Sequence, residues 1–164
     1  DRQQKIELSK ITEAEFDEAM DYLAKEAEQL RIISTPISKE EIINLVAKKY
    51  GDNPDLRSVG SLPDHEGILQ ETCMYDGGDN KVCVFAMFVK EDKRDLLIEG
   101  KSASHHKNLY AEIMQKRVQE HCGTDDEVFW NDLQSFHDDD CNWDSSGINS
   151  YGEANRIHLI TLYA

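Results

Sequence analysis

The stretch NWDSSGINSYGE, residues 142–153, has the residue types of a calcium-binding loop. Gly147 stands at the sixth position, where the loop of an EF-hand makes its sharp turn. Residues with side-chain oxygen atoms fall at positions one, three, five and twelve: Asn142, Asp144, Ser146 and Glu153. Because oxygen atoms at these positions bind calcium in an EF-hand, the spacing raises the hypothesis of a calcium site.

Three features argue against an EF-hand. Position one is Asn142, which lacks a carboxylate charge, and position eight is Asn149, where an aliphatic residue is usual. The segment that follows the loop is predicted to be a strand and not the exit helix of an EF-hand. We therefore expect a solvated acidic loop without a cofactor. Looser calcium binding by the neighbouring aspartates is the alternative: Asp138, Asp139, Asp140 and Asp144.

Two adjacent histidines, His105 and His106, could supply a general acid or base at the start of a predicted helix. Adjacent helical residues diverge by about 100 degrees, so the two rings cannot grip one metal ion together. Exposed side chains in a first helical turn are the expectation. A hydrolase that pairs one of these imidazoles with a carboxylate is the catalytic alternative.

Four cysteines form an even set without a C-x-x-C pair, which predicts two disulfides in a secreted protein. A hairpin that is symmetric about Gly78 would place Cys73 opposite Cys83, within reach of a disulfide. Cys122 would then pair with Cys141. The other connectivities remain open, and four free thiols in a cytosolic chain are the alternative.

Aromatic and acidic residues gather in residues 125–147, and this combination is typical of protein interfaces. The predicted binding surface contains four of them: Phe136, Asp139, Trp143 and Asp144. Burial of the same rings in the core is the alternative interpretation.

The elements that must position these residues begin with two helices. Apolar residues recur at alternating spacings of four and three from Phe16 to Leu30, and Thr12 with Glu15 matches a capping box. A second helix starts after Ser38, which forms the same pattern with Glu41. The first stripe is predicted to pack on its own domain, and a short coiled-coil seam is the alternative.

The segments 68–75, 81–90 and 95–100 are predicted to be strands, as are 127–130 and 156–163. A third helix is predicted over 104–122, as its apolar residues follow i,i+4 rows. The fold class is therefore α+β, with a mainly antiparallel sheet of four to five strands and a helix on one face. We expect one domain over 1–164, with a helical N-terminal segment over residues 1–51 and a sheet-rich, disulfide-containing segment over residues 67–164.

Charge and hydropathy exclude several classes of protein. The chain has 164 residues and a formal net charge of −15, which disfavours binding to nucleic acid or to an anionic membrane surface. No apolar run approaches the roughly 20 residues of a membrane span. The acidic charge suits a partner with a basic surface.

The leading hypothesis is a secreted, disulfide-stabilised protein of the toxin, effector or inhibitor type, which binds another macromolecule without catalysis. An intracellular acidic immunity-type protein that neutralises a basic toxin is the second hypothesis, and the hydrolase is the third. A sheet followed by a helix ending in RVQEHCG resembles secreted fungal killer-toxin-like α/β sandwiches and small pathogen effectors. This resemblance covers one helix and the number of cysteines, and it assigns no residue roles.

Overall fold

The computed structural model describes residues 12–78, 81–119 and 126–164. The chain divides into two compact units, residues 1–35 and residues 36–164. The boundary lies between the first two helices of the chain.

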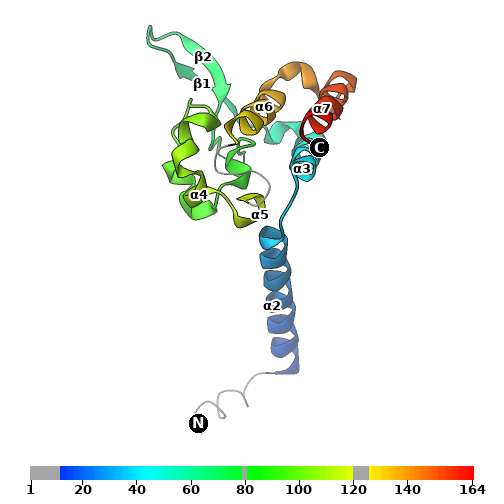
Figure 1. The fold of residues 1–164 in the computed structure, drawn as a ribbon. Helices are drawn as coiled ribbons and strands as arrows, with labels where there is room; N and C mark the ends of the chain where they lie inside the picture. Colours follow the sequence, from blue (N-terminus) through cyan, green and yellow to red (C-terminus); the bar gives the residue numbers. More distant parts are fainter. Residues whose placement is uncertain (1–11, 79–80, 120–125) are drawn as a thin grey trace. The chain divides into compact units, whose positions relative to one another are not determined.

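The described portion of the first unit is one helix, α2 (Glu13–Ser34) (Figure 1). It begins with the predicted capping box, in which the hydroxyl of Thr12 accepts from the backbone N–H of Glu15 and the Glu15 carboxylate accepts from the backbone N–H of Thr12. Its apolar residues at spacings of four and three form one face of the helix. This helix confirms the sequence prediction.

The second unit begins with α3 (Lys39–Asp52), also started by the predicted capping box, here between Ser38 and Glu41. The buried face of α3 is a central part of the hydrophobic core, and Ile42, Ile43 and Val46 in it are fully buried. Because both helix starts carry two reciprocal hydrogen bonds, local sequence alone defines where these helices begin.

A hairpin follows α3. The short 3₁₀ helix η1 (Pro54–Leu56) leads into β1 (Val59–Pro63), which pairs antiparallel with β2 (Leu69–Cys73). Figure 1 shows this hairpin projecting from the rest of the second unit. Of the predicted strands, only 68–75 corresponds to a strand of this sheet.

The apolar run 81–90, predicted as a central strand, is buried but is not a strand. It turns through the 3₁₀ helix η2 (Ala86–Phe88), and η3 (Glu91–Leu96) follows where another strand was predicted. An uninterrupted apolar run indicates burial without fixing the backbone, because all of its side chains face the core in either conformation.

The third predicted helix is broken into three pieces: η4 (Ala103–Leu109), α4 (Tyr110–Ile113) and α5 (Lys116–Gln119). The helix is interrupted after Ile113 because Met114 forms an antiparallel bridge with Val89, and the backbone there cannot continue the helical hydrogen bonds. The end of the predicted helix, including Cys122, lies outside the described residues. The resemblance to killer-toxin-like sandwiches loses its basis, because only the two-stranded β1–β2 sheet precedes this segment in the described residues and the helix itself is broken.

The C-terminal region is helical. It contains α6 (Glu127–Asp138), the 3₁₀ helix η5 (Asp140–Asn142), a two-residue hairpin of β3 (Trp143–Asp144) and β4 (Gly147–Ile148), and α7 (Ser150–Tyr163). The strands predicted at 127–130 and 156–163 are therefore wrong. Asn149 caps α7 by accepting from the backbone N–H of Gly152, and this local signal outweighs the β-branched residues that suggested a strand.

The fold is thus broadly α+β, but the sheet of four to five strands is not formed. The described residues contain two antiparallel sheets of two strands each. A large aromatic core joins α3, α6 and the irregular segment between them. Its fully buried aromatic members are Tyr50, Phe85, Phe88, Tyr110, Phe129 and Trp130.

Candidate functional site

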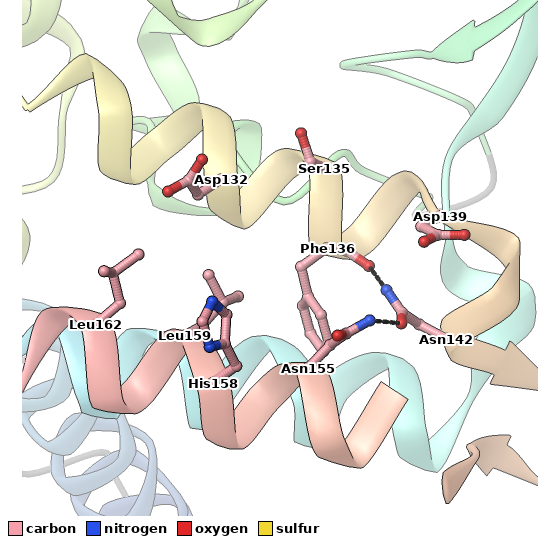
Figure 2. Close-up of a pocket in the computed structure, with 9 residues that line it drawn as sticks. All are labelled: Asp132, Ser135, Phe136, Asp139, Asn142, Asn155, His158, Leu159 and Leu162. Carbon is pink, nitrogen blue, oxygen red and sulfur yellow. Dashed lines mark hydrogen bonds between the residues drawn. The ribbon is translucent and has the colours of Figure 1, made fainter. Parts of the chain in front are cut away.

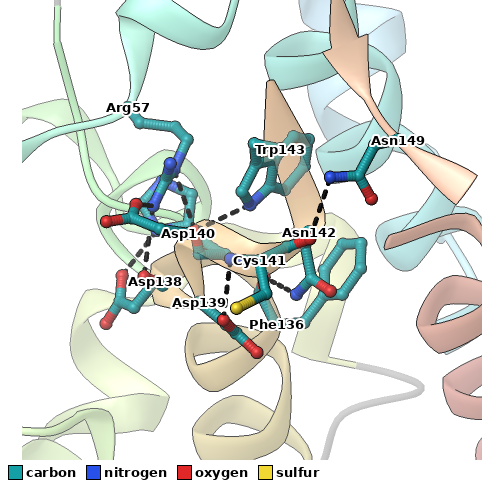
Figure 3. A network of polar contacts seen from close by, with 10 residues as sticks. Arg57, Phe136, Asp138, Asp139, Asp140, Cys141, Asn142, Trp143 and Asn149 are labelled. Carbon is teal, nitrogen blue, oxygen red and sulfur yellow. Dashed lines mark hydrogen bonds and ion pairs between the residues drawn. The ribbon is translucent and has the colours of Figure 1, made fainter. Parts of the chain in front are cut away.

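The loop between α6 and α7 is held by hydrogen bonds within the loop and to the helices on either side of it (Figure 3). The Asn142 side chain is buried, and it donates to the carbonyl of Phe136 and accepts from the amide of Asn155. Asp144 accepts from the backbone N–H and the hydroxyl of Ser146 within the hairpin turn. These contacts make the loop a rigid connection between the two helices.

Arg57 joins this loop to the segment that follows α3. Its guanidinium donates to the carbonyl groups of His137 and Asp138, at 2.9 and 3.1 Å, and to the carboxylate of Asp140 at 2.8 Å. The guanidinium also lies over the ring of Trp143, whose indole N–H donates to the His137 carbonyl. The C-terminal carbonyl groups of α6 are therefore satisfied by a cation, which also favours the negative end of the helix dipole.

The proposed calcium ligands are engaged in these structural contacts. Asn142 uses both atoms of its amide group within the protein, and the Glu153 carboxylate forms a two-pronged ion pair with Arg156. The exit segment is a helix after all, so one of the three arguments against an EF-hand was wrong. In the described portion of the chain, no group of three or more His, Cys, Asp or Glu side chains is arranged to hold a metal ion.

Calcium should therefore leave the stability of the chain unchanged. A ligand that binds only the folded state raises the melting temperature, and a site built as an EF-hand would respond to millimolar calcium. We expect the same melting temperature by circular dichroism in millimolar calcium and in excess chelator, with magnesium as the control for ionic strength. A shift of several degrees that Asp144→Ala abolishes would contradict this expectation.

A groove runs between α6 and α7, with a volume of about 290 Å³ (Figure 2). Phe136 and Leu159 lie at its base, and Leu162 lies beside them on α7 with more than half of its side chain exposed. Asn142 and Asn155 close one end through their hydrogen bond. The groove is therefore a half-open channel with an apolar base.

The polar lining of the groove is acidic. Asp132 lines it from α6 and Asp139 from the C-cap position of that helix, and neither lysine nor arginine is among the nine lining residues. One oxygen of Asp132 accepts from the hydroxyl of Tyr163, and one oxygen of Asp139 accepts from the backbone N–H of Cys141. Each carboxylate keeps charge and acceptor capacity for a ligand, because an ionised carboxylate accepts several hydrogen bonds.

The four predicted binding residues do not form one exposed surface. Phe136 and Trp143 are buried, so these two rings support the alternative that they belong to the core. Asp139 and Asp144 are exposed, and of these two only Asp139 lines the α6–α7 groove. The structure therefore joins Phe136 with Asp139 in the groove.

The two adjacent histidines are placed differently. His105 is exposed, whereas His106 is buried and its Nε2 accepts from the backbone N–H of Ile98. Burial lowers the pKa of His106 and the nearby His105 acts in the same direction, whereas interaction of the ring with the backbone of Ser102 opposes the shift. Among the described hydrogen bonds, none joins either ring to a carboxylate.

The groove also contains a serine, a histidine and an aspartate, which invites comparison with a catalytic triad. Ser135 and Asp132 lie on α6 and His158 lies on α7 (Figure 2). Among the described hydrogen bonds, none joins these three side chains, and Asp132 is bonded to Tyr163. Nucleophilic catalysis requires a nucleophile and a base in hydrogen-bond contact, so this set lacks the geometry of a triad.

The hairpin that was expected to bring Cys73 opposite Cys83 has a different register. Asp76 pairs with Val82, and the N–H of Cys83 donates to the carbonyl of Tyr75, so Tyr75 faces Cys83. The side chain of Cys73 lies outside the described residues, and the Cys73–Cys83 bond stays a prediction.

Cys141 is an exposed free thiol in the structure, contrary to the predicted bond with Cys122. A hydrogen bond to Asp139, followed by the negative charges of Asp139 and Asp140, raises the pKa of this thiol. A raised pKa lowers the thiolate fraction at neutral pH, so this environment does not activate Cys141 as a nucleophile.

Most groove residues were missed at the sequence level. The α7 wall consists of Asn155, His158, Leu159 and Leu162, which recur at the i, i+3, i+4 and i+7 spacing of one helix face. That signal was present, but the assignment of 156–163 to a strand concealed it. Arg57 could not be linked to α6 from sequence, because 80 residues separate it from His137.

No family model, curated protein or solved structure matches this chain. Within the described residues, no helix is both long and apolar enough to cross a bilayer. The function is therefore argued from the groove and its charge.

Proposed function

We propose that the chain is a non-enzymatic binding protein whose α6–α7 groove accepts a basic, amphipathic peptide segment of another protein. The observation that carries this proposal is the combination of an apolar base with two carboxylates in one half-open groove. Phe136 and Leu159 would contact the aliphatic portion of the ligand, while Asp132 and Asp139 would pair with its cationic groups.

The charge of the whole chain supports the same class of ligand. With a net charge of −15, the protein attracts cationic segments over a distance of several ångströms and repels acidic ones. Three further side chains at the end of α6 and in the loop that follows it add to this field: Asp138, Asp140 and Asp144. Association should therefore be fastest at low ionic strength.

The separation of the two groove carboxylates restricts the ligand further. Asp139, the C-cap residue of α6, comes seven residues after Asp132, which corresponds to a helical rise of about 10 Å. Two basic residues spaced by three positions in an extended peptide, or by seven in a helix, span the same distance. Apolar residues between them would face Leu159 and Leu162.

A displayed library of random peptides, selected against the full chain, tests this function. We expect the selected sequences to be rich in Lys and Arg at these spacings, with apolar residues between them. In fluorescence anisotropy, the double variant Asp132→Asn, Asp139→Asn should weaken a selected peptide by roughly 10- to 100-fold, which corresponds to about one or two charge-assisted hydrogen bonds.

The matched control is Asp92→Asn with Asp95→Asn, a pair of exposed aspartates on η3 that line none of the described pockets. This control removes the same charge from the chain. It should change the affinity for the peptide by no more than about twofold, an effect that comes only from the weaker long-range attraction between the acidic protein and the basic peptide. Selected peptides without enrichment in basic residues, or equal losses in the two double variants, would refute the groove as the binding site.

The cellular setting belongs to the same proposal. The predicted Cys73–Cys83 bond supports the secreted hypothesis, whereas the free thiol of Cys141 favours an intracellular immunity-type protein that binds a basic toxin. Intact mass after thiol alkylation of native, unreduced material distinguishes the two, since a cytosolic chain would be alkylated at all four cysteines.

A further inference from the structure

The first unit carries a stripe of large apolar side chains that are exposed within the described structure. Phe16 is 56% exposed, Met20 50% and Leu23 56%, although side chains of these types are usually buried. Together with Ala27 and Leu30 they form one face of α2, named the apolar seam below. A contiguous exposed stripe of this kind marks an interaction surface.

The spacing of the apolar seam is that of a coiled coil. Phe16, Leu23 and Leu30 recur every seven residues, and Met20 and Ala27 occupy the second apolar position of the same repeat. They therefore fill the d and a positions of two heptads without interruption. This 3.5-residue period keeps the seam in contact with a partner helix along its whole length.

The charges beside the apolar seam select the partner. In this register Glu26 occupies position g and Arg31 the next position e, and these positions face each other across a parallel two-stranded coiled coil. A second copy of α2 would thus place Glu26 against Arg31 twice. The preceding g and e positions are Ala19 and Ala24, so this stretch of the seam adds no repulsion between like charges.

Glu13 falls at an a position and Asp17 at an e position, both at the N-terminal end of the apolar seam, and four further charged residues lie away from it. Glu18, Asp21, Lys25 and Glu28 occupy the outer b and f positions, and Glu28 pairs with Arg31 along the same helix. The Arg31 guanidinium is 67% exposed on its side chain and has further N–H donors, so it can bridge both carboxylates.

We propose that α2 joins a second copy of the chain in a parallel, two-stranded coiled coil. The apolar repeat and the Glu26–Arg31 complementarity carry this inference. It is independent of the groove in the second unit, and a dimer would present two such grooves to one partner. Two grooves on one particle raise the apparent affinity for a partner with repeated basic segments.

Sedimentation analysis of the full chain tests the proposal, with Cys141→Ser as the background that removes disulfide-linked dimers. We expect the mass to rise with concentration from the 18.8 kDa of one chain toward twice that value. Leu23→Glu should raise the dissociation constant of the dimer by roughly 100-fold or more, because it places two charges in the apolar seam. A carboxylate added at an exposed outer c position, Gln29→Glu, should have little effect.

A charge-swap series tests the parallel orientation. Glu26→Lys should raise the dissociation constant about three- to tenfold, and adding Arg31→Glu should restore it to within about twofold. The control is Glu18→Lys, which makes the same change in net charge at an outer position. Because that control reduces the repulsion between two acidic chains, it should tighten the dimer slightly.

Oxidative cross-linking of Phe16→Cys completes the test. A parallel dimer places the two introduced thiols side by side, whereas an antiparallel one separates them by about 20 Å, the rise from residue 16 to residue 30. A mass that stays at one chain up to high concentration would overturn the proposal, and would show that the seam is covered in another way. A dimer that survives Leu23→Glu, or one that Phe16→Cys does not cross-link, would overturn it equally.

Discussion

Gly147→Ala is expected to destabilise the second unit by about 3–5 kcal/mol, which is a large fraction of the stability of an ordinary domain. Gly147 has a φ of +117°, a conformation that L-residues rarely adopt. A Cβ atom there would also lie 2.2 Å from the carbonyl oxygen of Gly51 in α3. Backbone strain and steric overlap therefore add, because neither can relax without moving the β3–β4 hairpin away from α3.

Chemical unfolding in urea measures this loss as a lower midpoint with an unchanged slope. The matched control is Gly67→Ala, because Gly67 also has a positive φ, +79°, but a Cβ atom added to it would meet nothing within 4 Å. Strain alone should cost about 1–2 kcal/mol there. Equal losses in the two variants would mean that the hairpin does not approach the α3 backbone as closely as described.

Acidification is expected to destabilise the chain below about pH 6.5, before most carboxyl groups titrate. His137 and His106 are buried, and burial lowers the pKa of each below the ordinary value of 6.5. For His137 the hydrogen bond from its Nδ1 to Asp138 opposes this shift, and the charges of Arg57 and Lys49 add to it. Both rings are therefore neutral in the folded chain at pH 7.

The sign follows from proton uptake. A histidine whose pKa is lower in the folded chain than in the unfolded chain binds more protons when the chain unfolds. Its contribution to the free energy of unfolding is therefore complete above about pH 6.5 and is lost as the pH falls. By pH 5, each histidine should remove up to about 2 kcal/mol from the free energy of unfolding. Urea unfolding at several pH values between about 7.5 and 5 measures this slope.

Replacing His137 with Gln should reduce the slope by about half, since one of the two buried titrating histidines is then gone and His106 remains. His65→Gln is the control, because the His65 side chain is 88% exposed and meets solvent in both states. An unchanged slope in His137→Gln, or a stability that rises on acidification, would show that this ring is already charged in the folded chain.

The helices that the sequence predicted well are those whose first residue is determined by a capping motif of a few neighbouring residues. Thr12 with Glu15 and Ser38 with Glu41 fix α2 and α3, because each capping box satisfies backbone groups that would otherwise lack partners. The start of α7 carries a similar local signal in Asn149. It was missed because the β-branched residues after Arg156 were weighted above the cap.

The segments that failed depend on contacts between distant residues. Residues 81–90 are buried as expected, but their turns are set by hydrogen bonds to residues 113 and 115, which no local pattern encodes. The hairpin register shifted by two residues, because the turn between Asp76 and Val82 is not symmetric about Gly78. Register depends on turn geometry, which composition leaves open.

The candidate site shows the same division. The loop 142–153 was expected to be polar, and the side-chain oxygen atoms of Asn142, Asp144 and Glu153 accept local hydrogen bonds, while the absence of an EF-hand stays a prediction. The groove beside it needed the pairing of α6 with α7, and that pairing could not be found while residues 131–138 were assigned to a loop and residues 156–163 to a strand. Phe136 and Asp139 were selected for their residue types, and only the fold shows that they share one groove.

The close backbone approach at the start of α7 has a consequence for recognition. A Cβ on Gly152 would lie 2.2 Å from the carbonyl oxygen of Asn142, so the first turn of α7 is clamped against the end of η5. The α6 and α7 walls of the groove are therefore held together at this end. A peptide that enters the α6–α7 groove would therefore bind a site that is already in its bound conformation. The protein would lose little conformational entropy on binding.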